Sequence, residues 1–254
     1  MILLLGGTSE TAPIARAIAG TGRKVLVSTA TDNRLDVGTE NSLIERRTGR
    51  LDPEGFASLI KELGITCLVD ATHPFAVEAS KSAREASALS GVPLITYKRP
   101  GSENHYKKTT YVENHDEAAV TAFSFRKPVL LTTGSRFLKP YLDVAKSSGV
   151  SLTARVLPHE ESRKAVEQLG LNESFVVYER GPFTVEQNVK LIKERNIGVI
   201  VSKDSGTAGG MAEKFEAARE TNCEMIVIRR PDDSSRGYGD AQSIAKAVEQ
   251  IWEI

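Results

Sequence analysis

Short apolar runs alternate with longer segments of helical periodicity along most of this chain. In the first hundred residues, strands are expected at Ile2–Leu5, 24–28, Cys67–Asp70 and 93–97, and helices at 13–19, 52–63 and 75–90. Runs that are apolar at every position are typical of parallel strands buried on both faces. The alternation therefore predicts βαβ units and a doubly wound α/β sheet.

The same alternation restarts in the second half of the chain. Strands are expected at 129–133, Leu152–Val156, 175–178, 198–202 and 225–228, and helices at 116–125, 138–147, 160–169, 185–195, 211–221 and 240–252. The Pro- and Gly-containing loop 99–104 is the best linker candidate. We therefore expect two Rossmann-like halves, 1–100 and 101–254, with mainly parallel sheets and a ligand cleft between them. The boundary is placed between 100 and 128, because helix 116–125 fits either half.

Composition excludes several partners. Lys and Arg (33) balance Asp and Glu (33), so a net charge of 0 gives no overall attraction to nucleic acid or to an anionic membrane. Cys67 and Cys223 lie in apolar runs, which argues against a disulfide framework and suits a reducing cytoplasm. The apolar run 1–5 is too short for a signal peptide or a membrane span. A cytoplasmic protein is expected.

The first apolar run leads into a tight turn made of Gly6, Gly7, Thr8, Ser9 and Glu10. A strand-to-helix turn directs backbone N–H groups at a phosphate, and glycine lets a pyrophosphate approach closely. Small residues, Ser9 and Ala12, occupy the later glycine positions of the usual fingerprint. We expect this turn to bind a dinucleotide, with Glu10 on backbone or ribose hydroxyls rather than on phosphate. A tight turn without a ligand is the alternative.

The end of the second apolar run bears on the choice of cofactor. NAD-binding folds carry an acidic residue there for the ribose hydroxyls. This chain has Ser28 and Thr29 instead, with Arg34 shortly after them. Hydroxyls and an arginine suit a 2′-phosphate, which favours NADPH over NADH and leaves NADH open. The alternative is that Ser28 and Thr29 are ordinary turn residues.

A second candidate stretch, Asp70-Ala71-Thr72-His73-Pro74, follows another apolar run, at the sheet edge where open α/β sheets bind ligands. Thr72 suits a nicotinamide amide or a ribose, and His73 suits proton donation or a carboxylate. Alternatively, Asp70 and Thr72 cap the next helix and His73 bonds backbone. The other histidines (105, 115 and 159) show no ligand spacing with His73, so no metal site is expected.

The densest polar stretch is Lys203-Asp204-Ser205-Gly206, followed by further glycines at 209 and 210. Glycines allow backbone N–H groups to face an anion, while Lys203 adds a charge and Asp204 a possible acid or base. The stretch is neither a Walker loop nor a nucleophile elbow. A flexible glycine turn is the alternative. The chain also lacks the Tyr-x-x-x-Lys pair of short-chain dehydrogenases.

In their order along the chain, Gly6-Gly7-Thr8-x-Glu10, Asp70-Ala71-Thr72-His73-Pro74 and Lys203-Asp204-Ser205-Gly206 resemble the precorrin-6A reductase family of cobalamin biosynthesis, including its cobalt-precorrin-6A branch. Further matches are Arg99-Pro100, Thr132-Thr133-Gly134, Arg155 to Pro158, Gly181-Pro182-Phe183, Lys214 with Ala217-Ala218, and Arg229-Arg230-Pro231. The resemblance thus runs nearly end to end. Lys98 and Gly101-Ser102 depart from the family, which often has Glu before the Arg-Pro pair and an aromatic residue after it.

The resemblance implies an NADPH-dependent reductase that transfers hydride to one double bond of a ring-contracted tetrapyrrole, and it allows transient contacts with neighbouring pathway enzymes. Such a substrate carries many carboxylates, so a neutral protein needs local cations. The expected substrate residues are Arg99, Thr133, Gly134, Arg136, Arg155, Arg180, Lys203, Ser205 and Gly206. For each arginine the alternative is a solvated surface charge.

The identity of the proton donor stays open among Lys203, Asp204, His73 and water. Two other functions compete with this interpretation. One is another Rossmann-type NADP-dependent reductase or epimerase, against which the missing Tyr-x-x-x-Lys argues. The other is a non-catalytic NADP-sensing module, which would not need the cation-rich second half.

Overall fold

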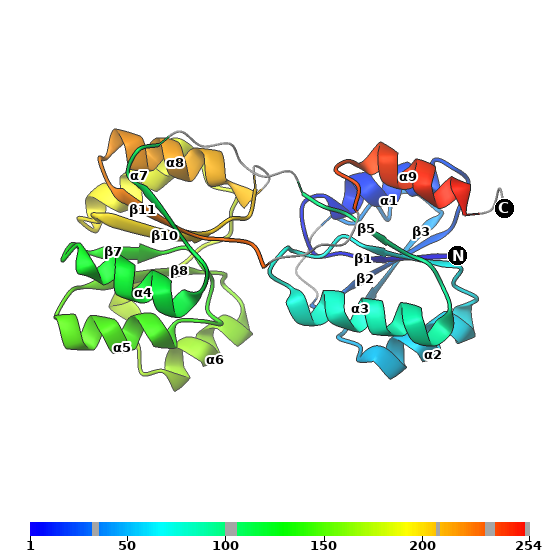
Figure 1. Ribbon diagram of the computed structural model, residues 1–254, viewed down its shortest axis with the longest axis horizontal. Coiled ribbons are helices and arrows are strands. Elements are labelled where there is room, and N and C mark those ends of the chain that lie inside the picture. Colours follow the sequence, from blue (N-terminus) through cyan, green and yellow to red (C-terminus); the bar gives the residue numbers. More distant parts are fainter. Residues whose placement is uncertain (32–35, 100–105, 207–208, 232–236, 252–254) are drawn as a thin grey trace. The chain divides into compact units, whose positions relative to one another are not determined.

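The computed structural model describes residues 1–31, 36–99, 106–206, 209–231 and 237–251. The chain divides into two compact units: Met1–Pro100 together with Pro231–Ile254, here called unit 1, and Gly101–Arg230, called unit 2 (Figure 1). In the described residues, every strand pairing of the two sheets is parallel. The expectation of an α/β fold with parallel sheets is therefore confirmed.

Unit 1 contains a five-stranded sheet in the order β3-β2-β1-β4-β5, which is the strand order of a Rossmann fold. Its strands are β1 (Ile2–Leu5), β2 (Val25–Thr29), β3 (Ile44–Thr48), β4 (Cys67–Asp70) and β5 (Leu94–Thr96). Helices α1 (Thr11–Ala19) and α9 (Ala241–Gln250) cover one face, and α2 (Pro53–Leu63) and α3 (Val77–Ser90) cover the other (Figure 1).

The end of the chain belongs to unit 1, whereas the sequence pattern predicts a second half of 101–254. Tyr238 returns beside β5, donating from its N–H to the Thr96 carbonyl (2.9 Å) and accepting from the Lys98 N–H (2.8 Å). Helix α9 then buries Ile244 and Val248 in the core that α1 shares with β1 and β2. An amphipathic pattern predicts a helix but does not say which sheet it covers.

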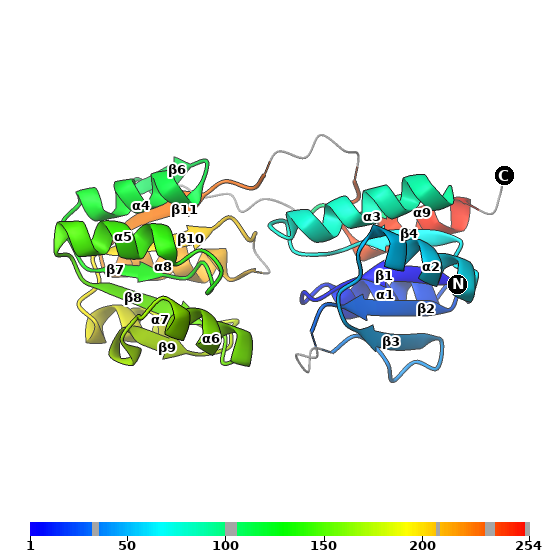
Figure 2. The same cartoon turned by 90° about the horizontal axis from the view of Figure 1, so that it is seen from below.

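Unit 2 contains a six-stranded sheet in the order β6-β11-β10-β7-β8-β9, with β6 and β9 at opposite edges (Figure 2). Its strands are β6 (Thr109–Val112), β7 (Val129–Leu131), β8 (Leu152–Val156), β9 (Val176–Tyr178), β10 (Val199–Lys203) and β11 (Glu224–Ile228). Helices α4 (His115–Ser124), α5 (Lys139–Ser148) and α6 (Glu160–Gln168) cover one face, and α7 (Val185–Glu194) and α8 (Met211–Glu220) the other (Figure 1). A short 3₁₀ turn, η1 (Glu173–Phe175), precedes β9.

Each sheet has a point where neighbouring parallel strands lead to helices on opposite faces. In unit 1 this point lies between β1, which leads to α1, and β4, which leads to α3. In unit 2 it lies between β7, which leads to α5, and β10, which leads to α8. Open α/β sheets bind ligands at the carboxyl ends of such strands. Among the described residues, no helix is long and apolar enough to cross a membrane.

Candidate functional site

The turn after β1 has the geometry of an anion-binding strand-to-helix turn. Gly7 has φ +120° and open space where a Cβ would lie, while a Cβ on Gly6 would fall 2.4 Å from the Thr11 side chain. Thr11 Oγ1 fixes the turn by accepting from the N–H groups of Gly7 (3.0 Å) and Thr8 (3.1 Å). In the described part of the chain, the Ser9 N–H at this helix start has no hydrogen-bond partner. The turn therefore retains donor capacity for an anion.

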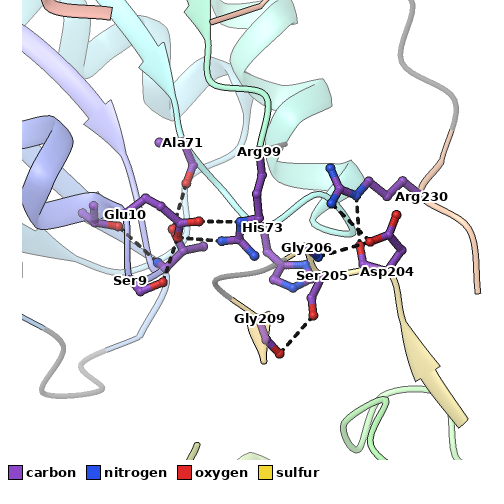
Figure 3. Close-up of polar contacts among 12 residues, drawn as sticks. Ser9, Glu10, Ala71, His73, Arg99, Asp204, Ser205, Gly206, Gly209 and Arg230 are labelled. Carbon is purple, nitrogen blue, oxygen red and sulfur yellow. Dashed lines mark hydrogen bonds and ion pairs between the residues drawn. The ribbon is translucent and has the colours of Figure 1, made fainter. Parts of the chain in front are cut away.

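Glu10, at the end of this turn, is ion-paired with Arg99 (Figure 3). Arg99 Nε lies 2.5 Å from Glu10 Oε1, and Arg99 Nη2 donates to Oε2 at 2.6 Å. Burial acts to raise the pKa of Glu10, but the charge and hydrogen bonding of Arg99 outweigh it and lower that pKa. Ser9 Oγ also donates to Oε2 (2.9 Å). The carboxylate thus pairs with a guanidinium, where the sequence suggested backbone or ribose.

The stretch after β4 lies directly beside this turn in unit 1. Thr8 Oγ1 is 3.4 Å from the Ala71 carbonyl, so the two loops at this switch point are in contact. Asp70 Oδ1 accepts from the Thr72 N–H (3.0 Å) and hydroxyl (2.7 Å), which holds the loop in shape. His73 Nδ1 accepts from the Phe75 N–H (3.2 Å), and Pro74 forms the intervening turn. The structure thus brings both predicted stretches together.

The carboxyl ends of β2 and β3 form a second polar cluster in unit 1. Ser28 and Thr29 are buried at the end of β2, as candidates for contact with a cofactor. Arg47 Nη1 donates to Ser28 Oγ (2.7 Å), and Arg46 Nη2 lies 3.3 Å from Thr29 Oγ1. Arg34 lies outside the described residues. The sequence pattern does not predict β3, so neither arginine is among the predicted site residues; the adjacent Arg-Arg pair is the available signal.

In unit 2 the loop after β10 is held in a fixed shape (Figure 3). Asp204 Oδ1 accepts from the Gly206 N–H (3.2 Å) and from Arg230 Nη2 (3.2 Å), and the Asp204 carbonyl accepts from Arg230 Nε (3.0 Å). Ser205 Oγ donates to the Gly209 carbonyl (3.1 Å), and Gly206 takes φ +70°. The Asp204 carboxylate therefore has a clear role in shaping the loop.

Lys203 ends β10 beside an aromatic cluster. Its Nζ lies 5.4 Å from the centroid of the Phe137 ring, against which His115 stacks at 4.4 Å. Burial, and then the charge of Arg136, lower the pKa of Lys203. Burial and then the charge of Lys203 lower the pKa of His115 to about 4, so His115 is neutral near pH 7. Arg136 itself is exposed.

Arg155 and Thr133 lie at the carboxyl ends of β8 and β7, next to the switch point of unit 2. Each is only 5% exposed. Arg155 Nη2 donates to Asn188 Oδ1 (2.7 Å), and its guanidinium lies 3.8 Å from the Phe183 ring centroid. Within the described residues, Arg155 Nη1 and Thr133 Oγ1 have no hydrogen-bond partner. Burial lowers the pKa of Arg155 to about 10.

Two further predicted residues of unit 2, Gly134 and Arg180, are less buried than Thr133 and Arg155. Gly134 follows Thr133 with φ +84°. Arg180 is exposed after β9, with Nη2 3.3 Å from His159 Nε2. Lys203, Thr133 and Arg155 thus end three adjacent strands of unit 2, whereas Arg99 belongs to unit 1.

Two parallel sheets, each with a glycine-containing turn at its switch point, define a Rossmann-like α/β protein. A family model described as "Precorrin-6x reductase CbiJ/CobK" matches residues 1–252. The chain belongs to this family, and it is an oxidoreductase of cobalamin biosynthesis. The family predicted from the sequence is thereby confirmed.

Individual relatives cover nearly the whole chain. A cobalt-precorrin-6A reductase of Priestia megaterium is 37% identical over 232 residues, covering 91% of each chain. A cobalt-precorrin-6A reductase of Methanocaldococcus jannaschii is 34% identical over 254 residues, covering 98% of each chain. The solved structure of CobK precorrin-6A reductase superposes with a TM-score of 0.81 at 24% identity, covering 99% of this chain and 97% of that one. This superposition confirms the fold.

Proposed function

We propose that this chain reduces one ring double bond of cobalt-precorrin-6A, with NADPH as the hydride donor. The observation that carries the proposal is that the two switch points present different chemical groups. Unit 1 has a strand-to-helix turn with the geometry that binds phosphate. Unit 2 has polar residues at the ends of three adjacent strands, and two of them, Lys203 and Arg155, are cations. Both relatives described above bear the name cobalt-precorrin-6A reductase, which favours the cobalt-loaded substrate over the metal-free one.

The residues of unit 1 fit a dinucleotide. Open space at Gly7 leaves room for a pyrophosphate, and the Ser9 N–H, which no described residue accepts from, leaves donor capacity for it. Arg46 and Arg47, held by Thr29 and Ser28, add two guanidinium groups where the ribose of an adenosine is expected. Guanidinium groups bind phosphate well, which favours NADPH over NADH.

When bound, NADPH supplies a hydride to the substrate. The residues of unit 2 then orient a polycarboxylate ring and stabilise the negative charge that hydride addition creates. We favour Lys203 as the proton donor, because it ends β10 at the switch point of unit 2 and its lowered pKa eases proton release. Asp204 is less suited, since Arg230 and the Gly206 N–H hold its carboxylate.

Anaerobic incubation with NADPH and either cobalt-precorrin-6A or metal-free precorrin-6A tests this proposal. We expect nicotinamide absorbance to fall with the cobalt form, and more slowly or not at all with the metal-free form. NADH in place of NADPH should be a poorer donor. NADPH that binds but stays reduced with both tetrapyrroles would instead identify a sensing module.

A further inference from the structure

Arg155 is a buried cation whose polar partner is a neutral side chain. In the described part of the chain it makes no ion pair with a carboxylate, and its polar contact is the neutral Asn188 amide (2.7 Å). Phe183 covers one face of the guanidinium at 3.8 Å. Nη1 is buried and has no partner among the described residues. A positive charge in such a place is costly unless an anion accompanies it.

Lys214 is a second cation in the same part of unit 2. It lies in the first turns of α8, and its Nζ donates to the Gly209 carbonyl (3.0 Å). Burial, and then the charge of Arg155, lower the pKa of Lys214 to about 8. Asn188, which bonds Arg155, lies on α7, and α7 and α8 pack in one apolar core, so both cations lie on the same face of the unit 2 sheet. The nearby acids, Glu179 and Glu213, act on them electrostatically without forming an ion pair in the described residues.

We propose that Arg155 and Lys214 together bind one carboxylate group of the tetrapyrrole substrate. This subsite rests on the proposed function and deepens it, since it assigns Lys214 a binding role. Asn188 and Phe183 are positioning residues that fix the guanidinium plane. The orientation of Nη1 is therefore set before the ligand binds. A planar carboxylate with two oxygens suits one guanidinium and one ammonium group.

A phosphate of NADPH shares this anionic chemistry, but the structure favours the carboxylate. The turn suited to a pyrophosphate and the Arg46–Arg47 pair both belong to unit 1. Arg155 and Lys214 belong to unit 2, next to the strand ends that carry Thr133 and Lys203. Separate titrations with substrate and with cofactor distinguish the two sources.

The test is an equilibrium titration of cobalt-precorrin-6A into the enzyme without NADPH, followed by tetrapyrrole absorbance. Without a hydride donor this measures binding alone. Arg155→Met and Lys214→Met should each weaken substrate binding by about 10- to 100-fold, the range expected for a charged hydrogen bond. Their Kd for NADPH, measured by nicotinamide fluorescence, should stay within about twofold of the parent value.

Two further variants sharpen the result. Arg155→Lys keeps the positive charge but loses the paired N–H donors of the guanidinium group. It should therefore recover part of the affinity that Arg155→Met loses. Arg219→Met is the control for Lys214→Met: it removes an exposed cation of α8 that pairs with Glu216. This variant should bind substrate like the parent. Thermal unfolding of each variant shows that it is folded.

The subsite is overturned if either Arg155→Met or Lys214→Met, once shown to be folded, binds substrate like the parent. It is equally overturned if NADPH binding weakens and substrate binding does not, because the anion would then be a phosphate. A parent enzyme that binds the tetrapyrrole through these residues but never oxidises NADPH would disprove the proposed reduction and leave the subsite standing.

Discussion

Two buried arginines in the two units of this protein have opposite electrostatic surroundings. Arg99 in unit 1 is 7% exposed and is paired through two nitrogens with the Glu10 carboxylate. Arg155 in unit 2 is 5% exposed and contacts a neutral amide and an aromatic ring. The same residue type therefore serves two purposes. Arg99 completes a pair within the fold, and Arg155 is left with capacity for an external anion.

Arg99 also accounts for Glu10, a carboxylate that on its own would repel phosphate from this turn. Its negative charge is neutralised by Arg99, so it does not oppose an anion at the neighbouring amides. The pair also ties the turn after β1 to the segment that follows β5. The candidate site of unit 1 thus contains an internal ion pair, whereas that of unit 2 contains Arg155, which forms no ion pair with a carboxylate among the described residues.

The largest predicted effect comes from breaking the internal pair. Glu10→Ala removes the carboxylate that pairs with the buried Arg99 guanidinium, which should lower the free energy of unfolding by about 3 kcal/mol. Urea unfolding of the parent and the variant measures the difference. Adding Arg99→Met to Glu10→Ala should restore much of the loss, because the guanidinium that Glu10 neutralised is then also removed.

An exposed pair in the same unit provides the control. Arg16 on α1 pairs with Asp36 and Glu40, all well exposed, so Arg16→Ala should change stability little. If Arg16→Ala proves as damaging as Glu10→Ala, burial is not what distinguishes the Glu10–Arg99 pair.

The second prediction concerns the cation at the switch point of unit 2. Lys203→Ala should lower turnover by about 100-fold, as expected for the loss of a general acid, and should also weaken substrate binding. NADPH binding should be unchanged, because the proposed dinucleotide turn belongs to unit 1. Lys139→Ala removes an exposed lysine of α5 that pairs with Asp143 and serves as the matched control. If Lys203→Ala has the same kinetics as the parent, the loop after β10 is not part of the active site.

A third prediction separates NADPH from NADH. Arg47→Ala should weaken NADPH binding about tenfold and leave NADH binding nearly unchanged, since only NADPH carries the 2′-phosphate. Fluorescence titration with both nucleotides measures the ratio, and Arg84→Ala on the exposed side of α3 is the control. An equal loss of affinity for both nucleotides would show that Arg47 stabilises β3 and does not discriminate between the two cofactors.

Much of the fold was predictable because most strands are apolar at every position. The two strands that the sequence pattern does not predict are β3 and β6, which both lie at sheet edges. Ile-Glu-Arg-Arg-Thr in β3 and Thr-Thr-Tyr-Val in β6 are half exposed, so they lack the continuous apolar run of a central strand. The return of α9 to unit 1 was also unpredictable, since periodicity does not identify a packing partner.

The sequence indicates which loops at strand ends carry the candidate site residues. It does not indicate which side chains pair with one another. Glycines and polar residues after apolar runs correctly located the loops at both switch points. That Glu10 pairs with Arg99, 89 positions away, depends on how the chain folds back. Nor does any local pattern reveal that Lys214, in an amphipathic helix, interacts with Arg155. Such contacts come from tertiary structure, which spacing along the sequence does not encode.

The smallest predicted effect is a pH-dependent change in stability at Lys214. Its pKa is about 8 in the folded chain against an ordinary value of 10.5, so between these values the unfolded chain binds more protons. Parent stability should therefore rise with pH across this window, relative to Lys214→Met. Below about pH 8, Lys214→Met should be the more stable protein, by on the order of 1 kcal/mol, because a buried charge is gone.

The substitution leaves little else unsatisfied, because Ser205 Oγ still donates to the Gly209 carbonyl (3.1 Å) when the lysine is removed. Arg155 and Glu213, the charged neighbours of Lys214, are present in both proteins, so the difference isolates Lys214. Urea unfolding at neutral and alkaline pH gives this difference. Saturating cobalt-precorrin-6A should reverse the order at neutral pH, because its carboxylate stabilises the parent and not the variant. A difference that does not change with pH or with substrate would mean that Lys214 is an ordinary helix residue.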